Sequence, residues 1–334
     1  MLDPAAADVW SKYLTLKPFG RCLASFLIYS FCQSTTYLGC LSKVKVRVLV
    51  TGASGFIGRH ILLALRQQGI DAVVVGRTRF QLPTKQIELD LLSVTDYTPL
   101  LQEAQATHLL HLAWQAEHGK YWTSPLNLRW QEATTRLVEA FCATGGQQVV
   151  IAGTCAEYDW THGYCREDST PLNPATLYGT AKDVTRRLVM AVCEQHHVPF
   201  AWGRIFLPFG HGESTSRLIP SLIDVFRGKR APFGVNTNAY RDFLHASDVA
   251  EGFVRLLIQG ASGAYNICSG EPTRVVEVVT TLAVLLNADP EPVLALTPER
   301  SGEPHFLAGE NIKLRTLGWR PVLTLTAGLQ QVLS

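Results

Sequence analysis

The sequence predicts an α/β protein with a doubly wound parallel sheet and a smaller C-terminal lobe. Two observations predict this class. Apolar runs alternate with runs of helical periodicity from residue 44 to residue 206, which is typical of βαβ units. From residue 207 to residue 334 the chain is richer in glycine, proline and irregular segments. We therefore expect a first domain over 44–206 and a lobe over 207–334, parts of which return to the sheet.

The expected strands are short apolar runs, as in strands that are buried on both faces of a parallel sheet. They lie at residues 44–50, 72–75, 108–113, 148–152 and 200–206. The expected helices have apolar residues spaced three and four positions apart. They lie at residues 59–68, 94–104, 126–143 and 186–196, and in the lobe at 216–227, 246–259 and 275–287.

The composition narrows the class of protein. Lys and Arg number 30 against 28 Asp and Glu, which leaves a net charge of +2. So balanced a chain has no overall field that would attract nucleic acid or an anionic membrane. The eight cysteines form no CxxC pair and no Cys/His spacing suited to zinc, so we expect no metal site. Scattered thiols indicate a reducing compartment, which we take to be the cytoplasm.

Residues 1–43 form a leader that the fold class does not explain. Its apolar run, 22–32, follows basic residues, which is typical of a targeting signal or an anchor. The run is shorter than the roughly 20 apolar residues that a membrane-spanning helix needs, and no clear cleavage site follows it. Targeting or anchoring stays open, but we prefer a poorly ordered extension or a start codon assigned too early.

A glycine-rich turn, TGASGFIG at 51–58, follows the first expected strand. The first glycine permits a tight turn, the second lets the backbone approach a pyrophosphate, and the third lets helix and strand pack closely. The helix that follows offers free N–H groups and a partial positive charge to phosphates. This strand–turn–helix context predicts a Rossmann dinucleotide site. The residues expected to bind the cofactor in it are Gly52, Ser54, Gly55, Phe56, Ile57 and Gly58.

The end of the second expected strand indicates which nicotinamide dinucleotide is bound. An acidic residue there would bind the ribose 2′-hydroxyl of NAD, whereas arginine receives the 2′-phosphate of NADP. The chain has Arg77 and Arg79 at this place and no acid. A guanidinium grips a phosphate in bidentate fashion, so NADP is favoured over NAD, with Arg77 as its ligand. The alternative is that both arginines are solvated loop charges.

Three residues form a candidate catalytic set. Tyr178 and Lys182 are four apart, and residues at this spacing share one face of a helix. A lysine ammonium beside a phenol would lower the phenol pKa from about 10, so that Tyr178 could exchange a proton near neutral pH. Thr154 follows the expected strand at 148–152, and the carboxyl ends of parallel strands face the ligand crevice.

Taken together, these segments resemble the extended short-chain dehydrogenase/reductases. Within that family the most similar branch is that of the nucleotide-sugar epimerases, dehydratases and ketoreductases. The resemblance extends from about residue 44 to the C-terminus. The matching landmarks are residues 51–58, 90–91, 111–113, 154, 178 and 182, RDFLHASDVA at 241–250, GAYNICSGE at 263–271 and LGWRP at 317–321.

The resemblance implies the remaining contacts with the cofactor. Asp90 and Leu91 would flank the adenine. Leu112 and Ala113 would lie beside the dinucleotide. Lys182 would bind the nicotinamide ribose while acting on the neighbouring phenol.

The resemblance also implies how a substrate is held. Thr154 would hold the substrate oxygen by a hydrogen bond and Tyr178 would transfer the proton. Arg241 and Arg300 match positions that bind the diphosphate of a nucleotide sugar, a role that paired guanidinium groups suit; structural salt bridges are the alternative. Leu207 stands where many relatives have an asparagine that contacts the substrate, which puts the identity of the sugar and base in doubt.

The residues after Thr154 limit the reaction. Family members that remove water from a hexose have an Asp-Glu pair there, which serves as the acid and base of the elimination. This chain has Cys155 and Ala156, so a 4,6-dehydratase is disfavoured. Glu157 comes one residue later and is a weaker candidate for a displaced acid or base.

We therefore expect an NADP-dependent oxidoreductase that reduces the 4-keto group of a nucleotide sugar. An NAD-dependent 4-epimerase needs the same three residues and is the first alternative. A non-catalytic NADP-binding regulator is disfavoured because Tyr178 and Lys182 are both present, and a reductase of non-sugar carbonyls would leave the paired arginines without a diphosphate. By resemblance, the chain would dimerise with a second copy through helices at 126–143 and 181–196.

Overall fold

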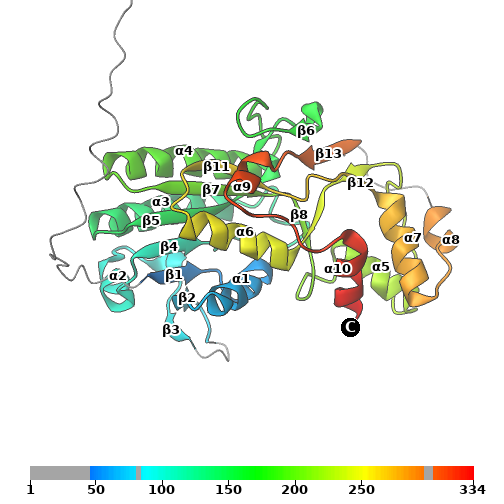
Figure 1. Ribbon diagram of the computed structural model, residues 1–334, viewed down its shortest axis with the longest axis horizontal. Coiled ribbons are helices and arrows are strands. Elements are labelled where there is room, and N and C mark those ends of the chain that lie inside the picture. The colour runs from blue at the N-terminus through cyan, green and yellow to red at the C-terminus, as the bar shows by residue number, and fades with distance from the viewer. Residues whose placement is uncertain (1–45, 80–83, 297–303) are drawn as a thin grey trace, which may run out of the picture. The chain divides into compact units, whose positions relative to one another are not determined.

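A parallel sheet of seven strands forms the centre of the protein (Figure 1). The computed structural model describes residues 46–79, 84–296 and 304–334. The strand order is β11-β7-β5-β4-β1-β2-β3 and every neighbouring pair is parallel. The strands are β1 (Arg47–Thr51), β2 (Asp71–Gly76), β3 (Lys85–Glu88), β4 (His108–His111), β5 (Gln148–Thr154), β7 (Phe200–Ile205) and β11 (Gly263–Ile267).

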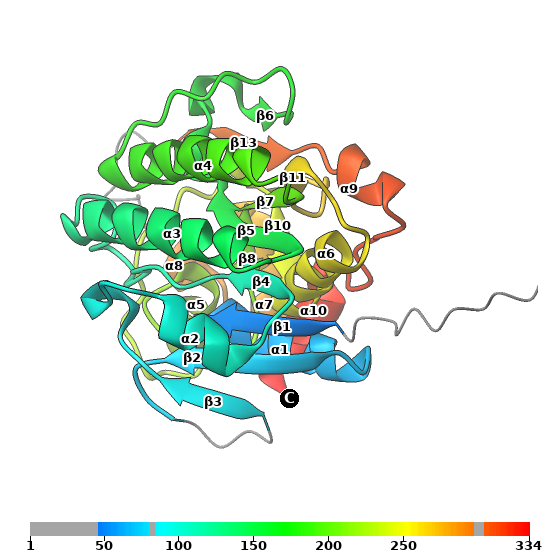
Figure 2. The same cartoon turned by 90° about the vertical axis from the view of Figure 1, so that its left-hand side faces the viewer.

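Two layers of helices cover the sheet (Figures 1 and 2). The helices are α1 (Phe56–Gln67), α2 (Thr98–Ala104), α3 (Leu126–Ala143), α4 (Leu177–Gln195) and α6 (Ala246–Ile258). Successive side chains of a strand point to opposite faces of the sheet. Val50 of β1 therefore packs on one face with Ile61 of α1 and Phe253 of α6. Leu49 packs on the other face, which α2, α3 and α4 cover, with Phe141 of α3. Both faces are buried, which is why the strands read as continuous apolar runs.

A second core lies in the C-terminal part of the chain, where α5, α7, α8 and α10 gather at one end (Figure 1). β8 (Leu207–Phe209) pairs with β10 (Phe243–His245), and a four-stranded sheet has the order β12-β9-β13-β6. Its strands are β6 (Tyr164–Cys165), β9 (Tyr240–Arg241), β12 (Thr273–Arg274) and β13 (Phe306–Gly309). The helices are α5 (Leu218–Phe226), α7 (Val275–Leu286), α8 (Glu291–Leu294), α9 (Ile312–Thr316) and α10 (Leu325–Leu333), and the short 3-10 turns are η2 (Leu91–Ser93), η3 (Cys155–Glu157) and η4 (Trp160–His162).

The fold class is confirmed, and each expected strand and helix is found, some with different ends. Strand β11 and the short strands and helices of the C-terminal part were not among the expected elements. Helix α4 begins at Leu177 rather than at 186, because the Thr176 side chain caps it by accepting a hydrogen bond from Gly179 N (3.1 Å). Tyr178 and Lys182 therefore lie in its first two turns. Strand β3 was not expected, because its sequence KQIE is polar and half exposed at the sheet edge. The leader lies outside the described residues.

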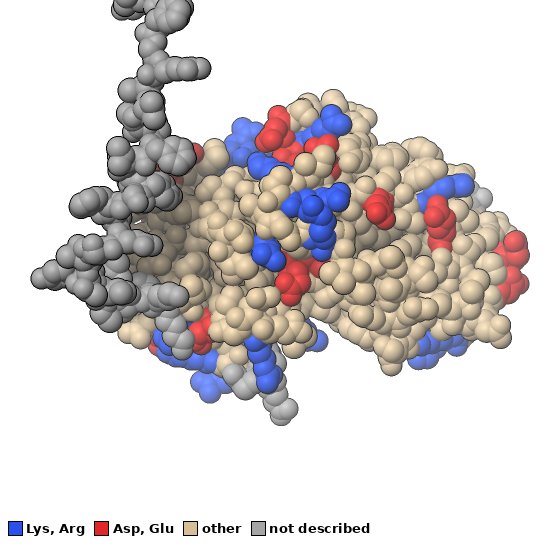
Figure 3. Space-filling model, viewed as in Figure 1, with Lys and Arg blue, Asp and Glu red and all other residues tan. Residues whose placement is uncertain are grey.

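The surface agrees with the balanced composition. Figure 3 shows basic and acidic side chains interspersed over one face, with wide uncharged areas between them. Within the described residues no helix combines the length and the apolar character needed to cross a membrane.

The glycine at the start of α1 sets the distance between that helix and β1. A Cβ atom at Gly58 would lie 2.2 Å from the carbonyl oxygen of Gly52 and 2.6 Å from Cα of Ala53. Both are backbone atoms, so the clash could be relieved only by moving the helix away from the turn. Gly76 at the end of β2 has nothing within 4 Å of such an atom.

We predict that Gly58→Ala lowers the free energy of unfolding by about 1–3 kcal/mol or more, as for an overpacked core. Gly76→Ala is the matched control and should be neutral or slightly stabilising, because alanine loses less backbone entropy on folding. Urea unfolding followed by circular dichroism measures both. Equal stability of the two variants would show that the turn and α1 are not in close contact.

Candidate active site

The glycine turn brings the ends of β1 and β4 together. Gly52 has a φ of +70°, a conformation that glycine adopts without strain. A Cβ atom there would come within 2.7 Å of Ala113 N. Helix α1 starts directly after Gly55 with no side-chain cap and no acid in its first turn, so its first N–H groups remain open to an anion. This cradle, which has no room for side chains, fits the phosphates of a dinucleotide.

A hydrogen-bonded threonine and histidine fix the segment after β4. The Thr51 hydroxyl accepts hydrogen bonds from Leu112 N and Ala113 N, both at 3.1 Å. Its single hydrogen is therefore donated to Nδ1 of His111 (2.8 Å), so the proton of the neutral ring lies on Nε2, which donates to Thr134 Oγ1 (2.9 Å). Burial lowers the pKa of His111 to about 3. The His111 ring is thus neutral and links β4 to β1 through the Thr51 hydroxyl.

The structure brings Thr154 and Tyr178 together. Thr154 ends β5 and Tyr178 lies in the first turn of α4. Burial raises the pKa of Tyr178 above its usual value, and the neighbouring Thr154 side chain opposes that rise. A hydroxyl and a phenol that lie close together can bind the same substrate oxygen, one holding it and the other exchanging a proton with it.

The expected lowering of the Tyr178 pKa by Lys182 is not found. Burial of the phenol dominates and raises the pKa instead. The Lys182 ammonium is occupied elsewhere: it donates to the carbonyl oxygen of Ala152 (2.9 Å) and lies 3.8 Å from the ring centre of Trp114. Burial also lowers the pKa of Lys182 itself to about 7.

An aromatic segment that the sequence interpretation did not single out packs against Tyr178. The ring centre of Tyr121 lies 4.8 Å from that of Tyr178 and the ring of Trp122 lies 5.8 Å away, both edge to face. The carbonyl oxygen of Trp122 also accepts a hydrogen bond from Tyr178 N (3.1 Å). The signal for this contact was present in the sequence as three aromatic residues between 114 and 122.

An arginine of the lobe reaches the same place. The charge of Arg217 lies close enough to Tyr121 to lower its pKa, but burial outweighs this effect and raises the Tyr121 pKa to about 12. Arg217 Nε in turn donates to Oε1 of Glu213 (3.0 Å). Burial raises the pKa of Glu213 to about 7, and it outweighs the arginine charge that lowers this pKa. Arg217 carries no motif, and for this reason the sequence did not reveal it.

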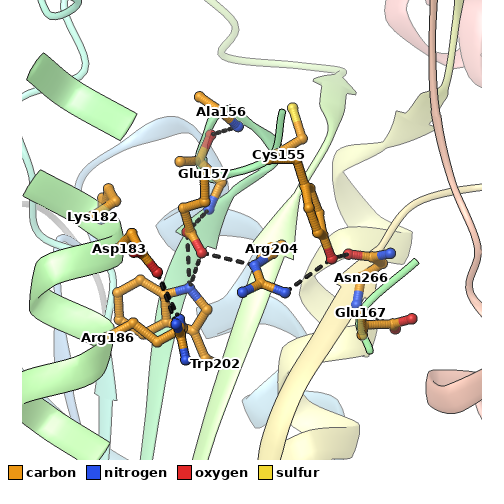
Figure 4. Close-up of polar contacts among 12 residues, drawn as sticks. Cys155, Ala156, Glu157, Glu167, Lys182, Asp183, Arg186, Trp202, Arg204 and Asn266 are labelled. Carbon is orange, nitrogen blue, oxygen red and sulfur yellow. Dashed lines mark hydrogen bonds and ion pairs between the residues drawn. The ribbon is translucent and has the colours of Figure 1, made fainter. Parts of the chain in front are cut away.

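Glu157 is not a displaced acid or base. Its side chain is completely buried, and Oε1 accepts hydrogen bonds from Thr154 N (2.8 Å) and Trp202 Nε1 (2.9 Å) (Figure 4). Oε2 forms an ion pair with Nε of Arg204 at 2.7 Å. With both oxygens occupied and no solvent contact, the carboxylate positions the end of β5 and has no path to a substrate.

The polar network continues from that ion pair across the sheet. Nη1 of Arg204 donates to the hydroxyl of Tyr158 (2.9 Å), which donates to Oδ1 of Asn266 (2.8 Å). Asn266 Nδ2 then donates to the carbonyl oxygens of Cys165 and Glu310. Figure 4 shows this chain of contacts running from β5 through β7 to β11.

The other expected cofactor residues lie near the carboxyl ends of the strands. Asp90 caps η2 by accepting a hydrogen bond from Leu92 N (3.1 Å), and Leu91 is buried. Arg77 is exposed just after β2. Arg79 lies 3.7 Å from Glu88 of β3 in an exposed ion pair.

Of the two expected substrate arginines the structure describes one. Arg241 is buried in β9, where Nη1 donates to the carbonyl oxygen of Tyr240 (2.9 Å). Arg300 lies outside the described residues. In the part of the chain that the structure describes, no group of three or more His, Cys, Asp and Glu side chains is arranged to hold a metal ion.

We predict that Glu157→Gln lowers the free energy of unfolding by about 3–5 kcal/mol, because it leaves the buried guanidinium of Arg204 without a counter-charge. The double variant Glu157→Gln/Arg204→Met should recover a large part of that loss. Chemical denaturation measures both. A Glu157→Gln protein of wild-type stability with strongly reduced activity would contradict the structural role and restore an acid/base role.

Comparison with known proteins places these features in a family. The model of the NAD dependent epimerase/dehydratase family matches residues 48–268. GDP-6-deoxy-D-mannose reductase of Pseudomonas aeruginosa is 27% identical over 312 residues, which are 86% of this chain and 96% of that protein. UDP-glucose 4-epimerase of Azospirillum brasilense is 26% identical over 304 residues, 82% of this chain and 87% of the epimerase.

A solved structure is similar over the same region. MoeE5 in complex with UDP-glucuronic acid and NAD superposes with a TM-score of 0.75 and 29% identity, covering 85% of this chain and 97% of MoeE5. The parallel sheet, the glycine turn and the Thr154–Tyr178 pair thus occur in a chain whose greater part matches one enzyme family. The protein belongs to the NAD-dependent epimerase/dehydratase family of enzymes.

Proposed function

We propose that this enzyme reduces the 4-keto group of a nucleotide sugar with NADPH. The observation that carries the proposal is the proximity of Thr154, at the end of β5, to Tyr178, in the first turn of α4, at the sheet edge that also carries the glycine turn. Parallel strands present their carboxyl ends at one edge, where such folds bind ligands. The nicotinamide, when bound, would supply the hydride for the keto carbon.

The chain's own residues would complete the reduction. Thr154 would hold the keto oxygen by a hydrogen bond. Tyr178, whose raised pKa keeps it protonated at neutral pH, would give its proton to that oxygen as the carbon–oxygen double bond becomes a single bond. Lys182 would bind the nicotinamide ribose. Hydride and proton together make the alcohol, so atoms and charges balance.

Elimination of water is not supported. Burial raises the pKa of the Cys155 thiol well above its usual value, so the thiol stays neutral and is a poor base. Ala156 has no ionisable group, and Glu157 is committed to its ion pair. The 4,6-dehydratase reaction therefore lacks its acid and base.

Two observations favour reduction and three favour epimerisation. The exposed Arg77 after β2 suits a 2′-phosphate, and the Pseudomonas aeruginosa relative is a reductase. Against this, Glu88 pairs with Arg79 beside the same strand end, the MoeE5 complex contains NAD, and the Azospirillum brasilense relative is a 4-epimerase. The NAD-dependent 4-epimerase is thus the second candidate.

The substrate class follows from the relatives and from the lobe. The named relatives act on GDP- and UDP-linked sugars. Arg241, which lies in the lobe, is proposed as one ligand of the diphosphate. Arg300 is proposed as the second such ligand. We also propose that the lobe is the substrate domain and that residues 44–206 form the cofactor domain.

We also propose a homodimer. Helices α3 and α4 pack side by side on one face of the sheet (Figure 2). They expose the apolar side chains of Leu128, Val184 and Leu188, which are 56%, 40% and 43% exposed. A second copy of this helix pair would cover them, and a self-complementary interface of this kind gives a two-fold dimer.

The cysteines support a cytoplasmic location as part of the proposal. Five free cysteines lie buried among the described residues: Cys142, Cys155, Cys165, Cys193 and Cys268. Unpaired thiols in a chain of this size are typical of a reducing compartment.

We predict stoichiometric oxidation of NADPH when the purified protein meets a 4-keto-6-deoxy nucleotide sugar, measured by absorbance. Tyr178→Phe should lower kcat by about 100-fold or more, as expected when a general acid is removed, while the affinity for NADPH stays within a few-fold of wild type. Interconversion of UDP-glucose and UDP-galactose without net NADPH oxidation would instead establish the epimerase. Unchanged biological activity of Tyr178→Phe would indicate a regulator.

We predict that Arg77→Ser raises the Kd of NADP⁺ by about tenfold or more and leaves the Kd of NAD⁺ unchanged. The physical reason is the loss of a charged hydrogen bond of about 1.5–3 kcal/mol to the 2′-phosphate. Isothermal titration calorimetry measures both constants. Arg79→Ser is the matched control, because this guanidinium already pairs with Glu88. Equal loss for both cofactors would remove the basis for assigning NADP.

A further inference from the structure

The contact between Lys182 and Trp114 is not explained by the reaction. Lys182 is 3% exposed, and its ammonium lies 3.8 Å from the centre of the Trp114 ring. A cation this close to an indole face is attracted by the negative charge of the ring face. The ammonium also donates a hydrogen bond to the carbonyl oxygen of Ala152 (2.9 Å). Trp202 is more distant, at 5.9 Å.

Trp114 is itself held in one orientation. Its Nε1–H donates to Oδ1 of Asn127 (2.8 Å), and its ring stacks on Trp130 with the ring centres 6.4 Å apart. It directly follows Ala113, whose amide is fixed by the Thr51 hydroxyl. Three independent contacts therefore determine where the ring lies beneath the ammonium.

Asn127 joins this ring to the segment around the candidate catalytic tyrosine. It is 1% exposed, and Nδ2 donates to the carbonyl oxygens of Tyr121 (2.7 Å) and Ser124 (2.9 Å). Turning the amide over would set its oxygen against two carbonyl oxygens, so the orientation is fixed. The segment held in this way carries the rings of Tyr121 and Trp122 that pack on Tyr178.

We propose that Trp114 is a positioning residue of this active site. Its ring holds the Lys182 ammonium in place, and its N–H links that contact through Asn127 to the segment that packs on Tyr178. The role in turnover rests on the proposed oxidoreductase function, whereas the hold on Lys182 is a property of the chain by itself.

The attraction between the Trp114 ring and the Lys182 ammonium opposes the effect of burial on the Lys182 pKa. Taking an ammonium out of water favours its neutral form, and burial lowers the Lys182 pKa to about 7. The carboxylate of Glu157 raises that pKa, and His111 on β4, the other titratable group that acts on it, is neutral. The Trp114 ring attracts only the charged form, so it works in the same direction as Glu157.

Two substitutions separate the ring from its N–H group. Trp114→Leu removes the ring face as well as the hydrogen bond to Asn127. Trp114→Phe keeps an aromatic face for the ammonium and loses only the hydrogen bond. Trp130→Leu is the matched control, because it removes an indole from the same stack without touching Lys182, and the Asn127 hydrogen bond and the fixed Ala113 amide still hold the Trp114 ring.

The first measurement is the titration of Lys182 in protein without cofactor. NMR of the [ε-13C]lysine-labelled chain follows it, with the signal assigned by its loss in Lys182→Arg. We expect Trp114→Leu to lower the midpoint by about one pH unit, the size of a desolvated cation–π contact, Trp114→Phe to lie closer to wild type, and Trp130→Leu to match wild type. An unchanged or higher midpoint in Trp114→Leu overturns the proposal.

The second measurement is the pH dependence of NADPH turnover. A midpoint one pH unit lower reduces the charged fraction of Lys182 near pH 7.5 by up to about tenfold. We expect kcat of Trp114→Leu to fall by a similar factor at pH 7.5 and by less at pH 6, with rescue by Trp114→Phe. A loss that is equal at every pH would mark a general packing defect and overturn the assignment. Wild-type protein without turnover would refute the proposed function and leave the titration result standing.

Discussion

A single buried carboxylate holds the centre of the candidate site. Glu157 accepts the N–H of Thr154, the indole N–H of Trp202 and the guanidinium of Arg204, so it ties the end of β5 to β7. Its negative charge also acts on Lys182. A buried charge is costly unless its lone pairs have hydrogen-bond partners. The partners of Glu157 belong to β5 and β7, and β5 also positions the Thr154 hydroxyl and, through the carbonyl oxygen of Ala152, the Lys182 ammonium. The position of the chemistry thus depends on satisfying this one group.

Much of the fold could be predicted because it follows from local patterns. Apolar runs give strands that are buried on both faces, and Gly52 and Gly58 stand at the two places of the turn where a Cβ atom would clash with the backbone. The carboxyl ends of parallel strands meet at one edge, so the sequence predicts that Thr154 faces the same place as the helix that carries Tyr178. Helix α4 begins at Leu177 and not at the predicted residue 186, because the Thr176 side chain caps its first turn.

The electrostatics of the site could not be predicted, because they depend on burial and on distant partners. The spacing of Tyr178 and Lys182 suggested a lowered phenol pKa, yet burial of the phenol raises it. Glu157 is of a residue type that often serves as an acid or base. Its side chain is instead bound by Trp202 and Arg204 of β7, some 45 residues further along the chain. Arg217 and Trp114 carry no motif at all. Their places follow from how the C-terminal part of the chain and the segment after β4 pack around Tyr178 and Lys182.

The raised pKa of Tyr178 has a consequence for the source of the proton in the proposed reaction. The phenol is fully buried and stays protonated at rest. In the proposed reduction each carbonyl takes up one hydride and one proton, and the phenol already carries that proton when the substrate binds. The transfer step itself therefore needs no proton from the solvent.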